Sequence, residues 1–273
     1  MAKLFIIPTP IGNLNDISTN QLNALRKSEV IFCEDTRVTK SFLNKIDIET
    51  PKLLSYHKYN EKERESTITN IFNKYQNIGL VSNAGAPTIS DPGYFIVNKA
   101  REMNVQILPI AGPSALINLL MATGIKYDSF TFIGFIKKKK DKIIHDLENA
   151  NKDIVVFFES PNRILSTLKI LEESFPNSYL VIGRELTKLH ETFYYGNPNS
   201  LLKTVKPKGE FAIMFKNIPD KAITIDNEII IENLKNIIKL GNTEKDAIKI
   251  ISNKYNLNKN KIYEIWVKYK SNS

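Results

Sequence analysis

Short apolar runs alternate with polar segments rich in Gly and Pro along most of the chain. Each run holds four to six residues, mainly Val, Ile, Leu and Phe, which is typical of strands buried on both faces. The pattern predicts seven strands, at residues 4–7, 30–33, 78–82, 105–110, 154–158, 179–183 and 211–215.

Amphipathic helices are predicted between these strands. Apolar side chains recur at helical spacing before Gly79 and again before Pro176. The two stripes are Ile68, Ile71, Phe72 and Tyr75, and Ile164, Leu168, Leu171 and Phe175. Ser160 can cap the second helix with Pro161 in its first turn, and Asp91 with Pro92 opens a third toward Ala100. The succession of strand, loop and helix predicts an α/β fold with mainly parallel sheets.

Three domains are predicted from interruptions in this succession of strands and helices. The pattern weakens between Met121 and Tyr127, which divides an N-terminal α/β lobe (1–122) from a C-terminal α/β lobe (123–222). Residues 227–273 lack such loops and predict a small helical module of helix-turn-helix type around "NLNKN". Its apolar positions are Ala247, Ile250, Ile251, Leu257, Ile262 and Ile265.

The net charge is +9, from 38 basic and 29 acidic residues. This balance fits either a soluble Lys-rich surface or a polyanionic partner such as nucleic acid. The basic run Lys137–Lys142 makes the charge uneven and favours the partner, although a solvated helix start would also explain it.

Several classes of protein are disfavoured. Cys33 is the single cysteine and the three His are scattered, so no disulfide within the chain and no Cys- or His-based metal centre is expected. The phosphate loop G-x-x-x-x-G-K-[ST] and the dinucleotide fingerprint G-x-G-x-x-G are both missing. The apolar stretch 115–125 is too short to cross a bilayer, and Pro8 and Pro10 interrupt the apolar N-terminus, so we expect a cytoplasmic protein.

Three loops, "PTPIGN", "NAGAP" and "AGPSA", follow strands of the first predicted sheet. The carboxyl ends of parallel strands meet at one edge, where ligands of α/β proteins bind. Gly allows close backbone approach and Pro fixes φ, which suits a ligand held by main-chain groups. Ser114 can cap the following helix and leave its N–H groups to face a carboxylate. Each loop alone is a tight turn, but together they predict a small-molecule site.

These loops belong to a longer series of motifs. In order they are "PTPIGNLNDIS", "CEDTR", "HKYNE", "LVSNAGAPTISDPG", "AGPSALINLLMATG", "FIGF", "FFESPNR", "RELTKLHE" and "KGEFAI". From Lys3 to Met214 the chain resembles the bacterial ribosomal RNA ribose 2'-O-methyltransferases of the tetrapyrrole methylase superfamily. The resemblance implies a two-lobed α/β fold that binds S-adenosyl-L-methionine between its lobes, and a homodimer. It also implies methylation of the 2'-hydroxyl of a cytidine in the decoding region of 16S rRNA, in the small ribosomal subunit.

The resemblance also implies which residues contact the cofactor. From the first lobe they are Pro10, Ile11, Gly12, Asn83, Ala84, Gly85, Ala86, Pro87, Ser114 and Ala115. From the second lobe they are Phe158, Glu159, Leu186, Thr187, Gly209, Glu210 and Phe211. The chain departs from the usual family motifs at Asn83 (Asp), Ala86 (Thr), Asn162 (His) and Lys137 (Pro).

Catalysis needs a group that removes the hydroxyl proton or stabilises the nascent alkoxide. The predicted catalytic residues are Asp35 and Arg37 in "EDTR" and Glu185 and Lys188 in "RELTK". Glu185 or Asp35 is the predicted base, and Arg37 and Lys188 would meet phosphate or developing charge. Structural ion pairs, with Thr36 as a helix cap, are an equal alternative for these motifs. "HKYNE" reads most simply as a helix start.

Two further functions stay open from the sequence. A methylase of corrin-type small molecules would share the fold, although the basic charge and the two motifs "EDTR" and "RELTK" oppose it. A non-catalytic RNA-binding regulator would use the tail helices and could tolerate the changes at Asn83 and Ala86. We expect the tail module to help grip the ribosomal subunit.

Overall fold

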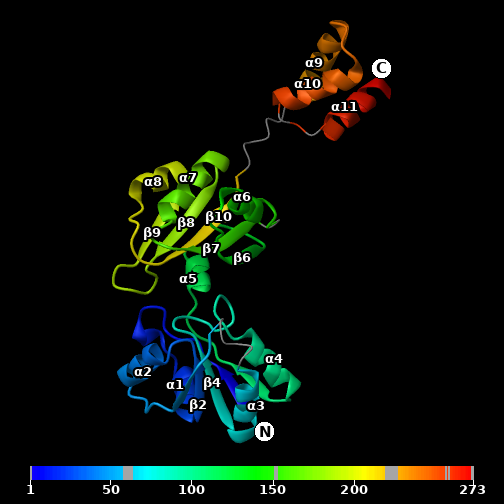
Figure 1. Cartoon of the computed structure of the whole chain (residues 1–273). Coiled ribbons are helices and arrows are strands. Elements are labelled where there is room, and N and C mark those ends of the chain that lie inside the picture. Colours follow the sequence, from blue (N-terminus) through cyan, green and yellow to red (C-terminus); the bar gives the residue numbers. More distant parts are fainter. Residues whose placement is uncertain are drawn as a thin grey trace. The chain divides into compact units, whose positions relative to one another are not determined.

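The computed structural model describes residues 2–57, 64–150, 153–218, 227–255, 257 and 259–271. The chain forms two compact units, Met1–Asn217 and Ile218–Ser273. The first unit contains both predicted α/β lobes, each built around one five-stranded sheet. Figure 1 shows the two sheets with their helices.

The first sheet is entirely parallel, as predicted. Its strands are β1 (Lys3–Ile6), β2 (Val30–Cys33), β3 (Lys52–Ser55), β4 (Asn77–Val81) and β5 (Gln106–Pro109), in the order β3-β2-β4-β1-β5. The central strands β1, β2 and β4 are largely buried, which explains their continuous apolar sequence. Strand β3 lies at the edge and is less buried, and the sequence pattern did not reveal it.

Helices cover both faces of this sheet. One face carries α3 (Glu65–Lys74) and α4 (Tyr94–Glu102), and the other carries α1 (Thr19–Lys27) and α2 (Thr36–Lys45). Alternate strand residues point to opposite faces. Leu4 and Phe32 therefore pack in the core with α3 and α4, and Phe5 and Ile31 pack in the core with α1 and α2. The short 3-10 helix η1 (Leu14–Asp16) precedes α1.

The second sheet is mixed, which departs from the parallel arrangement expected for both sheets. It contains β6 (Phe130–Phe135), β7 (Ile154–Glu159), β8 (Tyr179–Arg184), β9 (Thr192–Gly196) and β10 (Phe211–Lys216), in the order β6-β7-β10-β8-β9. Only β6 and β7 pair in parallel. The loop 185–191 between β8 and β9 is too short for the crossover that a parallel neighbour needs, so β9 returns antiparallel.

One face of the second sheet is covered by α6 (Lys140–Glu148), α7 (Ile164–Ser174) and α8 (Pro198–Thr204). The other face meets α5 (Ala115–Met121), which the predicted boundary assigns to the first lobe. Leu119 and Leu120 of α5 pack with Val156, Val181 and Met214. The helix therefore joins the two sheets, because it follows β5 in sequence and buries its apolar face on β8 and β10.

Two helices begin later than predicted. Helix α4 begins at Tyr94 after Gly93, and α7 begins at Ile164 after Arg163. Asp91 and Ser160 consequently lie in the loops that precede these helices and can face a ligand.

The second unit consists of α9 (Asn227–Lys239), α10 (Glu244–Tyr255) and α11 (Lys259–Ser271). Its core includes Leu234, Ala247, Ile251, Ile262 and Trp266, all nearly inaccessible to solvent. Of the predicted apolar positions, Ile250 is instead 42% exposed.

Candidate functional site

The loops after β1 and β4 are joined by their backbones. Thr9 and Gly85 exchange two N–H···O=C bonds of 2.9 Å each. The Thr9 hydroxyl donates to the Ser82 carbonyl at 3.1 Å, and the Ser82 hydroxyl donates to the Gly85 carbonyl at 3.0 Å. The buried Gln21 side chain donates to the Pro8 carbonyl at 2.7 Å, which fixes the first loop against α1. These bonds hold two of the predicted ligand loops in one arrangement.

The constrained composition of "NAGAPTISDPG" has a conformational cause. Gly85, Thr88 and Gly93 have φ values of 79°, 73° and 142°, in the region that L side chains rarely adopt. A Cβ on Gly93 would approach the Thr88 side chain to 2.7 Å. The segment thus turns sharply three times before α4 begins, which gathers its backbone and the Asp91 side chain around one space.

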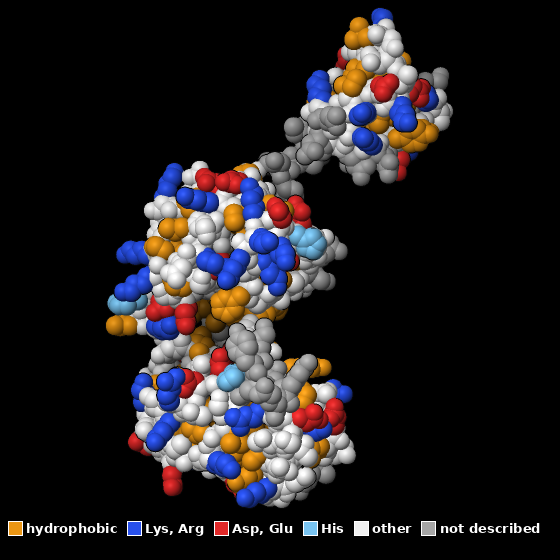
Figure 2. Space-filling view, viewed as in Figure 1, with side chains coloured by type: hydrophobic (Ala, Val, Ile, Leu, Met, Phe, Trp, Pro, Cys, Tyr) orange, Lys and Arg blue, Asp and Glu red, His pale blue; other side chains and the backbone are white. Residues whose placement is uncertain are grey.

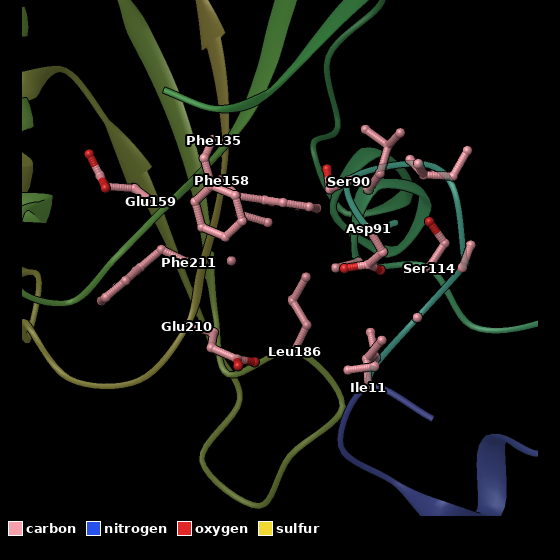
Figure 3. A pocket seen from close by; sticks show the side chains of 18 of the residues that line it. Ile11, Ser90, Asp91, Ser114, Phe135, Phe158, Glu159, Leu186, Glu210 and Phe211 are labelled. Atoms are coloured by element: carbon pink, nitrogen blue, oxygen red, sulfur yellow. The ribbon is translucent and has the colours of Figure 1, made fainter. Parts of the chain in front are cut away.

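That space is a pocket of about 350 Å³ at the carboxyl ends of the first sheet's strands. Loops of the first sheet form one wall and residues of β7, β8, β10 and the loop after β8 form the other (Figure 3). The volume lies within the range of about 300–1,000 Å³ typical of small-molecule sites. The lining is largely apolar, with a few polar side chains such as Asn83, Asp91 and Ser114.

Most residues expected to contact a cofactor line this pocket. They are Ile11, Asn83, Ala84, Gly85, Ala86, Ser114, Ala115, Phe158, Glu159, Leu186, Glu210 and Phe211. The expected residues outside the lining are each next in sequence to one that lines it, namely Pro10, Gly12, Pro87, Thr187 and Gly209. Ser114 is the N-cap residue of α5, but its side chain makes no capping hydrogen bond and points toward the pocket (Figure 3).

The two walls also touch at the pocket's base. The Asn13 amide donates to the Thr187 hydroxyl at 3.2 Å. A Cβ on Gly12 would overlap the Lys188 side chain, and one on Gly209 would overlap the Glu185 carboxyl group. Gly12 and Gly209 therefore serve close packing around the "RELTK" loop, while their neighbours Ile11 and Glu210 face the pocket.

Glu159 is bound on both carboxylate oxygens by protein groups. One oxygen accepts from the Ser160 amide at 2.6 Å and from the Arg163 guanidinium, and the other accepts from the Thr167 hydroxyl at 2.6 Å. The side chain is completely buried, and its carboxylate points away from the open part of the pocket (Figure 3). Through these contacts Glu159 holds the start of α7 in place.

Asp35 and Arg37 lie outside the pocket lining. Asp35, rather than Thr36, is the N-cap residue of α2, and its carboxylate accepts from the Arg37 amide at 2.8 Å. The Arg37 guanidinium donates to the same carboxylate at 2.8 Å and is 88% exposed. These bonds from Arg37 lower the pKa of Asp35 to about 2, so it is ionised and weakly basic at neutral pH.

Glu185 and Lys188 form an ion cluster with Glu210. The Lys188 ammonium lies 2.9 Å from carboxylate oxygens of both Glu185 and Glu210, and the Glu210 amide donates to Glu185 at 2.9 Å. Burial raises the pKa of Glu185, but the Glu210 amide and Lys188 outweigh it and hold the pKa below its ordinary value. For Lys188, burial lowers the pKa, and its bonds to Glu210 and Glu185 outweigh this and raise it. The pair stays charged, and only Glu210 of the cluster lines the pocket.

Asp91 is the carboxylate that the sequence analysis did not single out. It is half-buried, lines the pocket and directs its carboxylate into the open space (Figure 3). Burial and then the charge of Glu34 raise its pKa to about 6, although a hydrogen bond with Ser82 opposes this. The signal that could have found it was the "SDPG" turn, which was assigned to a helix start.

Other lining residues were also missed. Ile89, Ser90, Leu116, Phe135, Ser160, Pro161, Gly183 and Ala212 complete the lining. Phe135 is 60% exposed and makes an edge-to-face contact with Phe158 at 5.7 Å. In "HKYNE", Asn60 and Glu61 fall outside the described residues.

Within the described ranges, no group of three or more His, Cys, Asp or Glu side chains could hold a metal ion. None of the helices in the described part of the chain has the length and hydrophobicity that a membrane span requires.

Comparisons with known proteins agree with this architecture. Residues 3–201 match the family model of tetrapyrrole (corrin/porphyrin) methylases. Ribosomal RNA small subunit methyltransferase I of Mycoplasma pneumoniae is 34% identical, over 97% of this chain and 99% of its own length. Its namesakes from Mesomycoplasma conjunctivae and Bacillus subtilis are 40% and 32% identical, over 81% and 97% of this chain and 94% of each relative.

Solved structures share the fold at low sequence identity. Diphthine synthase aligns with a TM-score of 0.60 and 14% identity, over 79% of this chain and 90% of its own. Uroporphyrin-III C-methyltransferase from Thermus thermophilus, complexed with S-adenosylhomocysteine, aligns with a TM-score of 0.56 and 12% identity, over 79% and 97%. These likenesses establish the two-lobed α/β architecture.

Proposed function

Because this chain belongs to the tetrapyrrole (corrin/porphyrin) methylase family, we propose that it transfers a methyl group from S-adenosyl-L-methionine to ribosomal RNA. The acceptor proposed is the ribose 2'-hydroxyl of a cytidine in the decoding region of 16S rRNA, in the small subunit and hence in the cytoplasm. The relatives' printed names and the net charge of +9 support a ribosomal RNA substrate. The observation that carries the proposal is the pocket that the strained loop 83–93 builds at the sheet edge.

The residues present fit this cofactor. A folded nucleoside with an amino-acid tail needs apolar walls and a few polar groups, and the pocket offers both. Leu186, Phe158 and Ile11 supply apolar surface, and Ser114 and Asn83 supply polar side chains. Pro10, Gly12, Pro87, Thr187 and Gly209 would support these walls from the adjoining positions.

S-adenosyl-L-methionine, when bound, supplies a methyl group on a positively charged sulfur. The acceptor hydroxyl must lose its proton as its oxygen takes the methyl group, so a base beside the pocket accelerates transfer. Three carboxylates compete for this role. Asp35 and Glu185 were predicted, but both are held by cations away from the lining, whereas Asp91 faces the pocket with a higher pKa. We assign proton acceptance to Asp91, and leave Arg37 and Lys188 as proposed contacts for RNA phosphate.

The test is transfer of labelled methyl groups to small subunits from cells that lack the enzyme, followed by mapping of the modified ribose. Label at a 16S rRNA cytidine is expected, and an unlabelled rRNA would contradict the proposal. Calorimetry with S-adenosyl-L-methionine separates the alternatives, because a non-catalytic regulator need not bind it. A corrin-type methylase would bind it and leave rRNA unlabelled.

The base is tested with three variants of similar size. Asp91→Asn is expected to lower kcat by roughly 10²–10⁴-fold and to leave cofactor affinity within a few-fold. Asp35→Asn and Glu185→Gln are matched controls that should keep most of kcat. The assignment fails if Asp35→Asn or Glu185→Gln loses kcat and Asp91→Asn does not.

A homodimer is part of the proposal. Ile117 and Met121 lie one helical turn apart on α5 and are 49% and 74% exposed. Tyr195, 48% exposed, adjoins them through a 3.2 Å bond to the Ala122 carbonyl. An exposed apolar surface of this kind favours association with a second copy. Light scattering should give twice the chain mass for the wild type and the mass of one chain for Met121→Glu. A monomeric wild type would contradict the proposed homodimer.

A further inference from the structure

An aromatic side chain and a basic run meet at the rim of the pocket. Phe135 ends β6 and is followed by the buried Ile136 and then by Lys137, Lys138 and Lys139, all exposed. Among the residues that the structure describes, these three lysines form no ion pair. Lys and Arg side chains gather over β6 and α6 in Figure 2, above a hollow edged with hydrophobic side chains.

The backbone fixes Phe135 in this exposed position. The pairing of β6 with β7 shifts register between Phe132 and Phe135, and Gly134 has φ of 67°. Such a bulge re-aims the side chain that follows it. A Cβ on Gly134 would lie 3.7 Å from the Ser90 hydroxyl, so the bulge stands directly across from the loop that carries Asp91.

The segment is anchored on both sides. The Ile136 amide donates to the Phe158 carbonyl at 3.2 Å, and the Ile136 carbonyl accepts from the Arg163 guanidinium at 2.8 Å. Below the Phe135 ring, Phe158 packs edge-to-face on Phe132 at 5.1 Å. The exposed ring is therefore held in place, which costs a ligand little conformational entropy.

We propose that Phe135 and Lys137–Lys139 form the entry platform for a single-stranded RNA segment. The ring stacks on a base beside the acceptor nucleotide, and the lysines contact the neighbouring phosphates. This combination of a fixed aromatic face and free cations is how single-stranded nucleic acid is bound without base-specific hydrogen bonds. The inference rests on the proposed function for its substrate and names the surface that receives it.

The exposure of the ring places it at the rim of the pocket. Phe135 is 60% exposed, as is Ile89 of the same lining at 55%, whereas the lining residues Leu186 and Phe211 are 6% and 3% exposed. A ring at the rim can meet both a bound cofactor and an entering RNA. The test must therefore measure RNA and cofactor binding separately.

The experiment uses the full chain and a fluorescent single-stranded RNA oligonucleotide, titrated by anisotropy with S-adenosylhomocysteine present. Phe135→Ala is expected to raise the Kd for RNA roughly tenfold, as for loss of one base stack, and Phe135→Tyr to restore it. Phe130→Ala is the matched control, because Phe130 lies at the opposite end of β6, 39% exposed and outside the lining. Calorimetry should show that Phe135→Ala weakens cofactor binding much less than RNA binding, and that Phe135→Tyr and Phe130→Ala keep the wild-type cofactor affinity.

The lysines are tested by salt dependence. Lys138→Ala with Lys139→Ala should flatten the slope of log Kd against log salt by about 1.4, because each phosphate contact on a single strand contributes about 0.7. Lys203→Ala with Lys206→Ala removes the same charge from another exposed part of the unit and should leave the slope unchanged.

Two outcomes would overturn the proposed platform. One is an equal slope of log Kd against log salt for the two double variants. The other is a Phe135→Ala protein that loses affinity for the cofactor rather than for RNA. Methyl transfer by the wild type is measured in parallel. If the wild type binds RNA through these residues but methylates no RNA, the proposed function is refuted and the platform is not.

Discussion

The Glu159 carboxylate and the Arg163 guanidinium form an ion pair at 2.6 Å in which Glu159 is completely buried. The same guanidinium donates to the Ile136 carbonyl, so one pair ties together β7, the start of α7 and the end of β6. It therefore connects the wall of the pocket to the segment that presents Phe135.

Removing Arg163 should be costly because it leaves a buried charge uncompensated. Arg163→Ala is expected to lower the free energy of unfolding by about 3 kcal/mol in urea denaturation. Lys140→Ala breaks the exposed pair with Glu173 at 2.6 Å and should cost much less, because solvent screens this pair. Similar losses for both variants would show that the Glu159 pair is no stronger than a surface pair.

Asp91 should make stability depend on pH. Burial and Glu34 raise its folded pKa to about 6 from an ordinary 3.8, so the folded state binds the proton more tightly than the unfolded state. Stability contributed by the protonated acid is then present below pH 3.8 and lost as pH rises to about 6. Asp91→Asn should be more stable than wild type above pH 6, by about 1–2 kcal/mol after allowance for solvent screening.

The measurement is the difference in unfolding free energy between Asp91→Asn and wild type at several pH values. The difference should grow between pH 4 and 6 and then stay constant. A difference independent of pH would show that the Asp91 carboxyl titrates normally. In the wild type, kcat should fall as the pH drops through about 6, and this fall should be missing in Asp91→Asn, which lacks the carboxylate.

Gly85 should be required for the ligand loop rather than for stability alone. Gly85→Ala places a Cβ at φ 79° and 3.3 Å from Ile11, which lines the pocket. Gly124→Ala carries the same kind of backbone strain at φ 61° with open space around it. Both should lose about 1 kcal/mol of stability, whereas only Gly85→Ala should weaken cofactor binding in calorimetry. Equal cofactor affinities would remove Gly85 from the site.

Leu186 should contribute to both core and pocket. It is 6% exposed, packs against Gly183 and lines the pocket. Leu186→Ala is expected to cost about 2–3 kcal/mol of stability and to weaken cofactor binding roughly tenfold. Leu171→Ala, in the core on the other face of the sheet, should cost as much stability with cofactor affinity preserved. An equal loss of affinity in both would mean that instability, not contact, weakens binding.

All seven predicted runs coincide with strands. Six of these strands lie inside their sheets, where residues buried on both faces must be apolar. The seventh, β5, lies at a sheet edge and has no buried residue, but its sequence is still largely apolar. Strands β3, β6 and β9 were missed. Each lies at a sheet edge with partly exposed residues, and its apolar sequence is short or interrupted by a polar residue or Gly.

The ligand loops were likewise visible in the sequence, since Gly at a positive φ and Pro leave a compositional trace. What each side chain does was decided only by the tertiary structure. Asp35 was predicted as a possible base and Glu159 as a cofactor contact, yet their carboxylates form ion pairs with Arg37 and Arg163. Asp91 was predicted to open a helix, and Phe135 stood in a motif with no predicted role, yet the fold places both in the lining of one pocket. A sequence records the local backbone that a residue needs, whereas its charge partners and burial come from segments far away in the chain.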